Sequence, residues 1–181
     1  VLFRSKQSFD GYMNHTASNK EFVNAIGEIR ISDKQMLYTY FGYSNSYDER
    51  NGELTKGQYD TLDYVKNSNN TGNPAYVKNN AHSNVMSIRS GISQKWTFNK
   101  NISNNTSIFG SGLNSNVSSA GGWTDKAPVN YGIRSTVELN YALADQIRLT
   151  GNVGLEAQRQ NAQVIGYGMV TDSTNVKGYR S

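Results

Sequence analysis

Three arginines stand where they could bind an anion, at Arg89, Arg134 and Arg148. A guanidinium binds carboxylates and phosphates through a rigid fork of N–H donors. Each arginine falls on the polar side of a run in which polar and apolar residues alternate, so a water-filled lumen would expose all three to ligands. The alternative is that they pair with Glu138 and Glu156 on neighbouring strands, and the pattern fits both arrangements.

The other candidate binding residue is Trp123. It lies in a run of mostly small residues, 118–126, which predicts a flexible loop. An indole ring exposed in such a loop is costly in water unless it packs against the protein or binds something. We therefore predict that Trp123 contributes to ligand binding.

No arrangement typical of an enzyme, cofactor or metal site is visible in the sequence. The chain has no Cys and 2 His, and these two, His15 and His82, fall in separate predicted loops without carboxylates at metal-ligand spacing. Two Gly-x-Gly triplets, at 110–112 and 166–168, lack the following helix that a phosphate cradle uses. We expect no enzymatic activity, no cofactor and no bound metal.

Composition bounds the class of protein. The 181 residues suit one domain, and 36% of them are hydrophobic and 18% charged. The net charge of +4 is dispersed along the chain, which argues against a nucleic-acid partner. No stretch approaches the roughly 18 apolar residues of a membrane helix. A membrane β-barrel is compatible with this composition, because only every second strand residue faces lipid.

Alternation of apolar and polar residues with a period of two recurs along the chain and predicts β-strands. The clearest case is a hairpin with strands at 133–143 and 147–156. The remaining predicted strands lie at residues 1–9, 23–31, 37–43, 86–98 and 103–113.

The connections between these strands come in two sizes that alternate. Short turns are predicted near residues 32–34, 99–101 and 144–146. Long polar segments are predicted at residues 10–19, 46–83 and 114–130, with another beginning after Arg159. Alternate connections of an up-and-down sheet lie on the same edge, so the short turns would share one edge and the long loops the other, as in outer-membrane barrels.

These patterns predict an all-β fold, an antiparallel up-and-down transmembrane β-barrel, present here as an incomplete segment of about seven strands with long loops on one edge. Trp96, Phe98 and Tyr141 fall beside short turns, where an aromatic girdle would lie. Bacterial single-chain barrels use even strand numbers of at least about eight, so the segment is not expected to close. The alternative is a soluble antiparallel sandwich, whose strands alternate in the same way.

Three segments carry a family resemblance. Residues 52–59 read Gly-Glu-Leu-Thr-Lys-Gly-Gln-Tyr, in a long predicted loop. Asn-Tyr-Gly-Ile-Arg-Ser at 130–135 leads into a strand, and Gly-Leu-Glu-Ala-Gln-Arg-Gln at 154–160 ends the next. The first looks like the G-x-L-T-x-x-Q-[YW] loop of TonB-dependent outer-membrane receptors, and the others are similar to the middle barrel of the ferric-siderophore branch. The resemblance covers most of the chain.

The resemblance implies a barrel of about 22 strands that is plugged by an N-terminal domain and takes up scarce ligands. The implied partners are outer-membrane lipid, a small extracellular ligand such as a ferric siderophore, and an inner-membrane energy-coupling protein. The implied location is the bacterial outer membrane. Neither a plug, nor a TonB box, nor a terminal strand ending in an aromatic residue is visible, so residues 1–181 are interpreted as one partial β-barrel domain, a fragment of a larger receptor. The ligand contacts of the family vary too much to assign to positions in this chain.

Two functions fit these expectations. The first is a receptor segment whose long loops capture an extracellular ligand and whose polar strand face lines the uptake path. The second is a non-transporting binding or adhesion module, either a small outer-membrane protein or a secreted β-sandwich, that uses the same loops to bind glycans.

Overall fold

The computed structural model describes residues 1–61, 74–144, 147–169 and 177–180. They form one antiparallel sheet of ten strand segments. Its strands are β1 (Leu2–Phe9), β2 (Ser18–Ser32), β3 (Gln35–Glu49), β4 (His82–Asn99), β5 (Ile102–Ser118), β6 (Gly122–Lys126), β7 (Val129–Ala144), β8 (Ile147–Asn161), β9 (Val164–Met169) and β10 (Lys177–Arg180). Two short helices, α1 (Lys56–Thr61) and α3 (Pro74–Lys78), lie between β3 and β4. Neither of these described helices is long and apolar enough to cross a membrane.

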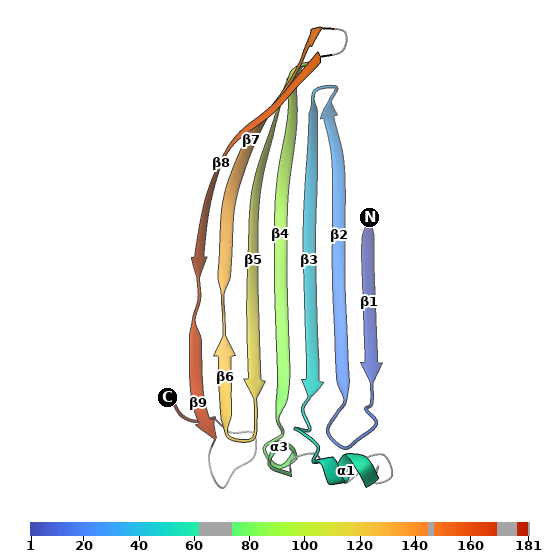
Figure 1. Cartoon of the computed structure of the whole chain (residues 1–181), viewed down its shortest axis with the longest axis vertical. Coiled ribbons are helices and arrows are strands. Elements are labelled where there is room, and N and C mark those ends of the chain that lie inside the picture. Colours follow the sequence, from blue (N-terminus) through green and yellow to red (C-terminus); the bar gives the residue numbers. More distant parts are fainter. Residues whose placement is uncertain (62–73, 145–146, 170–176, 181) are drawn as a thin grey trace.

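The two-residue turns lie on one edge of the sheet and the long connections on the other, as the sequence predicts, but the loop edge also carries the three-residue connection 119–121 (Figure 1). On the turn edge, two-residue turns join β2 to β3 and β4 to β5, and β7 pairs with β8 up to Ala144 and Ile147. The residues of that third turn, 145–146, lie outside the described residues. On the loop edge, residues 10–17 join β1 to β2, and residues 50–81, with α1 and α3, join β3 to β4. Within the described residues β1 does not pair with β10, so the sheet is open, and the all-β antiparallel prediction is confirmed.

Two pairs of strand segments are each one long strand with a short interruption. β6 continues into β7 and β8 into β9 without a change of register, so the ten segments make eight strands, one more than the sequence predicts. Both interruptions lie where Pro128 faces residue 162. Proline has no N–H, and the N–H and C=O of one strand residue point to the same neighbouring strand. The carbonyl of Pro128 accepts the N–H of Leu113 at 3.0 Å, so the donor that proline lacks would also have pointed to β5 and does not account for the interruption opposite residue 162.

The predicted long segments at 114–130 and after Arg159 are wrong. β5 runs to Ser118, a three-residue connection (119–121) follows, and β6 returns along β5. β8 continues past Arg159 to Asn161, and β9 follows. The Asn, Ser and Gly residues of these segments have low strand propensity, but pairing with strands on both sides satisfies their backbone groups and overrides it.

The two faces of the sheet differ in chemistry. Paired residues in an antiparallel sheet lie on the same face, so the register assigns every described strand residue to one face. The polar face carries Arg89, Arg134 and Glu156, and the apolar face carries Ile92 and Leu139. Other large side chains of the apolar face in the centre of the sheet are Val23, Ile29, Leu37, Phe41, Ile88, Ile108, Ile133, Val137 and Val153.

The aromatic residues expected beside the short turns share the apolar face. Trp96 and Phe98 on β4 stack with ring centroids 5.5 Å apart. Tyr141 lies on the same face of β7 near the turn edge. On β1 to β3 the polar face is less polar than predicted, because Phe3, Phe22 and other rings lie on it, with the first two 5.5 Å apart.

No second layer covers either face of the described sheet. Leu155 is 83% exposed and Val153 67% exposed, although both side chains are aliphatic. The buried apolar residues are Met13, Ala81 and Trp123, and all three lie at the loop edge rather than at mid-sheet. A sandwich buries the inner faces of two sheets against each other, so this single layer counts against the sandwich alternative.

The Leu-Thr-Lys-Gly-Gln segment of the family resemblance is a helix start. The Thr55 hydroxyl accepts the N–H of Gln58 at 3.2 Å, and the Gln58 side-chain oxygen accepts the N–H of Thr55 at 2.8 Å. This reciprocal arrangement is a capping box, which satisfies two backbone donors at the N-terminus of α1. The spacing of Thr55 and Gln58 therefore has a local structural cause.

Two glycines in the β7–β8 pair differ in the space around them, and substitution of each would show how closely the sheet is packed there. A Cβ at Gly132 would lie 2.8 Å from the Phe109 ring and 2.8 Å from the carbonyl oxygen of Ala157, whereas a Cβ at Gly151 would meet nothing within 4 Å. We expect Gly132→Ala to lower the free energy of unfolding by about 1–3 kcal/mol through overpacking, and Gly151→Ala to be neutral. Urea unfolding of the two variants checks this, and equal midpoints would contradict the close contact at Gly132.

Candidate functional site

Arg89, Arg134 and Arg148 lie on the polar face, as predicted, but far apart. Arg89 of β4 is opposite Ser111 of β5, and Arg134 of β7 is opposite Ser107 of β5. Strand spacing and rise then separate Arg89 from Arg134 by about 16 Å, and Arg148, near the turn edge, is farther still. The three arginines therefore cannot hold one small anion together.

The charge environment differs among the three arginines. Nε and Nη2 of Arg134 both lie 2.7 Å from Oε2 of Glu156, so the cross-strand ion pair that the sequence left open is formed at this position. Glu138 instead accepts a hydrogen bond from the Ser103 hydroxyl at 3.1 Å. In the part of the chain that the structure describes, neither Arg89 nor Arg148 forms an ion pair.

Arg89 lies between two hollows on the polar face. The larger, about 300 Å³, is lined by Ser87, Ser111, Asn130 and Gln160 besides Arg89 itself. The smaller, about 140 Å³, extends toward β2 and β3. Hydroxyls and amides around an unneutralised guanidinium can bind a carboxylate or a similar anion.

Trp123 is not in a flexible loop, contrary to the sequence prediction. It lies in β6 opposite Ser118 and is 8% exposed. Its ring packs edge-on against His82 with centroids 5.3 Å apart, and its Nε1–H donates to Asp125 Oδ1 at 3.1 Å. The ring therefore packs rather than projecting into solvent, and it fixes the β5–β6 hairpin to the start of β4.

His82, which was predicted in a loop, is the buried first residue of β4. Its ring stacks on Tyr47 at 5.2 Å, and Nε2 lies 3.2 Å from Asn116 Oδ1. Asn116 in turn donates to Asp125 at 2.7 Å. Burial, and secondarily the Glu49 carboxylate, raises the pKa of the Tyr47 phenol. We call Tyr47, His82, Asn116, Trp123 and Asp125 the loop-edge cluster.

Ser118 and His82 resemble a catalytic nucleophile and its general base, but they cannot act as a catalytic pair. The Ser118 hydroxyl lies 3.3 Å from His82 Nδ1, within reach of a proton transfer. The same oxygen accepts the backbone N–H of His82 at 2.9 Å, and Ser118 is 0% exposed. A substrate has no access to this hydroxyl, so the pair is structural.

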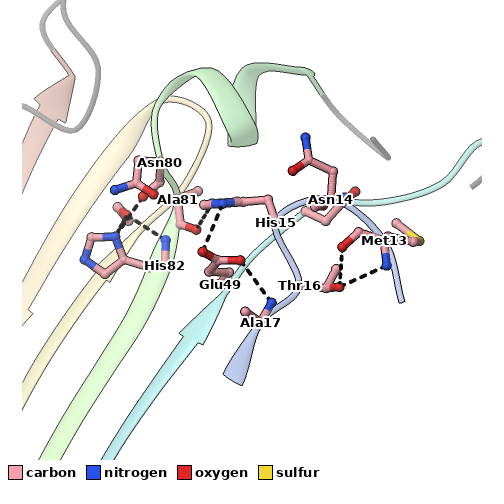
Figure 2. A network of polar contacts seen from close by, with 11 residues as sticks. Met13, Asn14, His15, Thr16, Ala17, Glu49, Asn80, Ala81 and His82 are labelled. Atoms are coloured by element: carbon pink, nitrogen blue, oxygen red, sulfur yellow. Dashed lines mark hydrogen bonds and ion pairs between the residues drawn. The ribbon is translucent and has the colours of Figure 1, made fainter. Parts of the chain in front are cut away.

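His15 connects two of the long loops (Figure 2). Its Nε2 lies 2.7 Å from the carbonyl oxygen of Ala81, and its Nδ1 lies 3.7 Å from Glu49. Glu49 also accepts the backbone N–H of Ala17 at 3.0 Å. Residues 10–17 are thereby held against the ends of β3 and β4. In the described residues, no group of three or more His, Cys, Asp and Glu side chains could hold a metal ion.

The contribution of Trp123 to the stability of the β5–β6 hairpin can be measured. Trp123→Ala removes a buried ring and a hydrogen bond, and we expect a loss of about 3 kcal/mol in the stability of this edge. Hydrogen–deuterium exchange over residues 115–123 should become faster, whereas Trp96→Ala, at the turn edge, should leave that exchange unchanged. Unchanged exchange in Trp123→Ala would mean that the ring does not hold the hairpin.

Comparison with known proteins identifies a likeness in fold. No protein family model and no curated protein matches the chain. Among solved structures the chain is similar to the crystal structure of the ferric citrate transporter FecA in its unliganded form, with a TM-score of 0.76 and 11% sequence identity. The match covers 95% of this chain and 25% of that chain. At this identity the likeness establishes the fold, an antiparallel segment of the kind found in that transporter.

Proposed function

We propose that the chain is part of the barrel of a TonB-dependent outer-membrane receptor that binds and actively takes up a scarce extracellular ligand, with an iron–siderophore complex as cargo. The likeness in fold to a ferric citrate transporter supports this proposal. The observation that carries it is the height of the apolar band on the apolar face.

That band has the dimensions of a bilayer. On β4 the apolar face is apolar from Met86 to Phe98 except at Ser90 and Gln94, a length of about 40 Å along the strand and about 28 Å at a strand tilt of 45°. Outer-membrane barrels expose an apolar band of about 25 Å. Toward the loop edge the same face carries the polar side chains of Glu21, Asn45, Asn84 and Asn114, of which Asn45 and Asn114 lie opposite Met86; Arg159 lies opposite Tyr131, farther from the loop edge.

Polar residues within the band hydrogen-bond to one another. Asn104 donates to the Ser135 hydroxyl at 3.0 Å, and the Thr106 hydroxyl donates to Asn104 Oδ1 at 2.9 Å. The Thr106 and Ser135 hydroxyls are 2.8 Å apart. Lipid offers no hydrogen-bond partners, so side chains that face it must satisfy one another. This cluster suits a hydrocarbon environment.

The polar face would then line the interior, with Arg89 and Arg148 as ligand contacts. Arg134 would act less directly, because Glu156 neutralises it. Trp123 would contribute by holding the loop edge in shape. The remaining partners in this proposal are outer-membrane lipid and an inner-membrane energy-coupling protein. The proposal includes no catalytic step, no cofactor and no nucleic acid.

A first prediction follows from the assigned faces. Leu139 lies on the apolar face of β7 and Glu138 on the polar face. Leu139→Arg in the complete receptor should be destabilising if its side chain faces hydrocarbon, by less than the about 2–4 kcal/mol of a midplane position because Leu139 lies opposite Ile102 near the turn-edge end of the band, whereas Glu138→Lys should be mild. Reversible unfolding from lipid bilayers measures both variants. Equal losses at the two positions would contradict the assignment of faces.

Ligand uptake tests the proposed function itself. Replacing residues 53–78 by a Gly/Ser linker of about eight residues keeps the contacts of Asn51 with Asn14, of Ala81 with His15 and of His82 with Ser118, but removes the Tyr76 carbonyl that accepts the N–H of Ala81. β3 and β4 lie side by side at this edge, so a linker of this length can join them. We expect normal surface level and heat-resistant folding, but at least about a tenfold loss of uptake of radiolabelled ferric complexes, with ferric citrate tested first, since connections of this length in a folded domain are kept for function.

The matched control alters the opposite edge. Replacing Asp33-Lys34 by Asn-Gly, a sequence suited to a two-residue turn, should change neither folding nor uptake. Wild-type uptake by the loop-replaced receptor at normal surface level would exclude the loop as the capture element. Absence of uptake of every ferric complex by the wild-type receptor would overturn the proposed cargo.

A further inference from the structure

A polar groove lies on the apolar face, beyond the loop-edge end of the apolar band. It encloses about 510 Å³ and is open to solvent. Its lining side chains come from four strand segments: Asn84 of β4, Asn114 and Asn116 of β5, Asp125 of β6 and Ile165 of β9, with Gln163 immediately before β9. It faces away from Arg89 and therefore belongs to neither the polar face nor the proposed uptake path.

The sheet arranges these residues in a row. Asn84 is opposite Asn116, Asn116 is opposite Asp125, and Asp125 is opposite Ile165. Three strand spacings give the row a length of about 14 Å. Asn114 lies on the same face of β5, two residues nearer than Asn116 to the apolar band. This footprint accommodates two linked sugar rings.

The lining matches the hydrogen-bonding needs of a polyol. A sugar hydroxyl both donates and accepts, and a side-chain amide offers both functions in one plane. Asn84, Asn114 and Gln163 are exposed, and their side chains form no hydrogen bond within the described residues. Asp125 is held in place at Oδ1 by the Trp123 and Asn116 donors at 3.1 and 2.7 Å.

Charge and shape favour a neutral glycan over an ion. Asp125 carries the one charged side chain that the lining places on the groove's face, because the register puts Lys126 on the opposite face of β6. The Ile165 side chain adds an apolar surface that suits the C–H face of a sugar ring. The Asp125 carboxylate would repel a phosphate, and a metal ion would need more than one such ligand.

We infer that this groove is a glycan-binding site, with the saccharide carried by a lipid head group beside the barrel or by a free oligosaccharide. The position just beyond the apolar band favours the lipid-borne source, and this part rests on the proposed membrane placement. Recognition of the saccharide itself does not depend on transport.

The experiment measures binding by the protein purified in a detergent without a sugar head group. Three probes are compared by calorimetry and native mass spectrometry: rough-type lipopolysaccharide, the oligosaccharide released from it, and its lipid anchor without the oligosaccharide. The wild type should bind at least one of the two glycan-bearing probes and bind the bare anchor at least tenfold more weakly. Binding of the free oligosaccharide identifies direct saccharide recognition, and binding of the intact glycolipid alone identifies the lipid-borne source.

Variants assign that binding to the groove. Asn84→Ala with Asn114→Ala should weaken glycan binding at least tenfold, and Asp125→Asn and Gln163→Ala provide independent readouts from other strand segments if the double variant folds poorly. Asn152→Ala is the matched control, because it removes an exposed amide from the polar face of β8. Uptake of ferric complexes should be unchanged in the Asn84→Ala/Asn114→Ala and Gln163→Ala variants, so failure of the glycan inference is distinguishable from failure of the proposed function. Equal binding of the bare anchor and the intact glycolipid, unchanged binding in the groove variants, or no binding of either glycan-bearing probe would overturn the inference.

Discussion

Backbone hydrogen bonds between neighbouring antiparallel strands hold the described sheet together, because the described strands have no second layer to pack against. Backbone pairing therefore sets the structure, and side chains adapt to whichever environment each face meets. A slip of β4 by one residue would exchange its two faces and move Arg89 among apolar residues of the neighbouring strands, such as Phe41 of β3 and Ile108 of β5. Uniform register through β2, β3, β4 and β5 keeps the arginines and the aliphatic residues apart.

Among the described residues the buried side chains lie at the loop edge, where long connections return over the strand ends. Ala81 and Ser118 are fully buried there, and His82 and Trp123 almost so. The contacts join segments that are distant in sequence: His15 reaches Ala81, and the N–H of His82 donates to Ser118. The loop edge is thus ordered by its own small core, while the middle of the sheet is ordered by strand pairing. This division would let the loops present a defined surface without support from a sandwich partner.

Three surfaces of different chemistry occupy separate parts of one sheet. The polar face carries Arg89 beside its hollow, the apolar band occupies the other face, and the Asn84–Ile165 groove lies beyond that band toward the loop edge. Their separation follows from two periodicities: alternation along each strand chooses the face, and position along the strand chooses the height. Under the proposed function the same sheet would contact cargo, lipid and glycan without these sites overlapping.

The sequence by itself determined the strands, the turn edge and the two faces, because alternation with a period of two is a local property of the chain. The start of α1 is also a local property, since Thr55 and Gln58 cap that helix through neighbouring backbone groups, although residues 46–83 were predicted as a loop. Only the tertiary structure decided that most of residues 114–130 form strands and not a loop. Their Asn, Ser and Gly content is typical of loops, yet β4, β5 and β9 supply the pairing and the His82 contact that make Trp123 a buried strand residue. Likewise the sequence placed Arg134 on the polar side. Only the β7–β8 register sets Arg134 opposite Glu156, whose carboxylate then neutralises its charge. No local pattern encodes a pairing between distant segments.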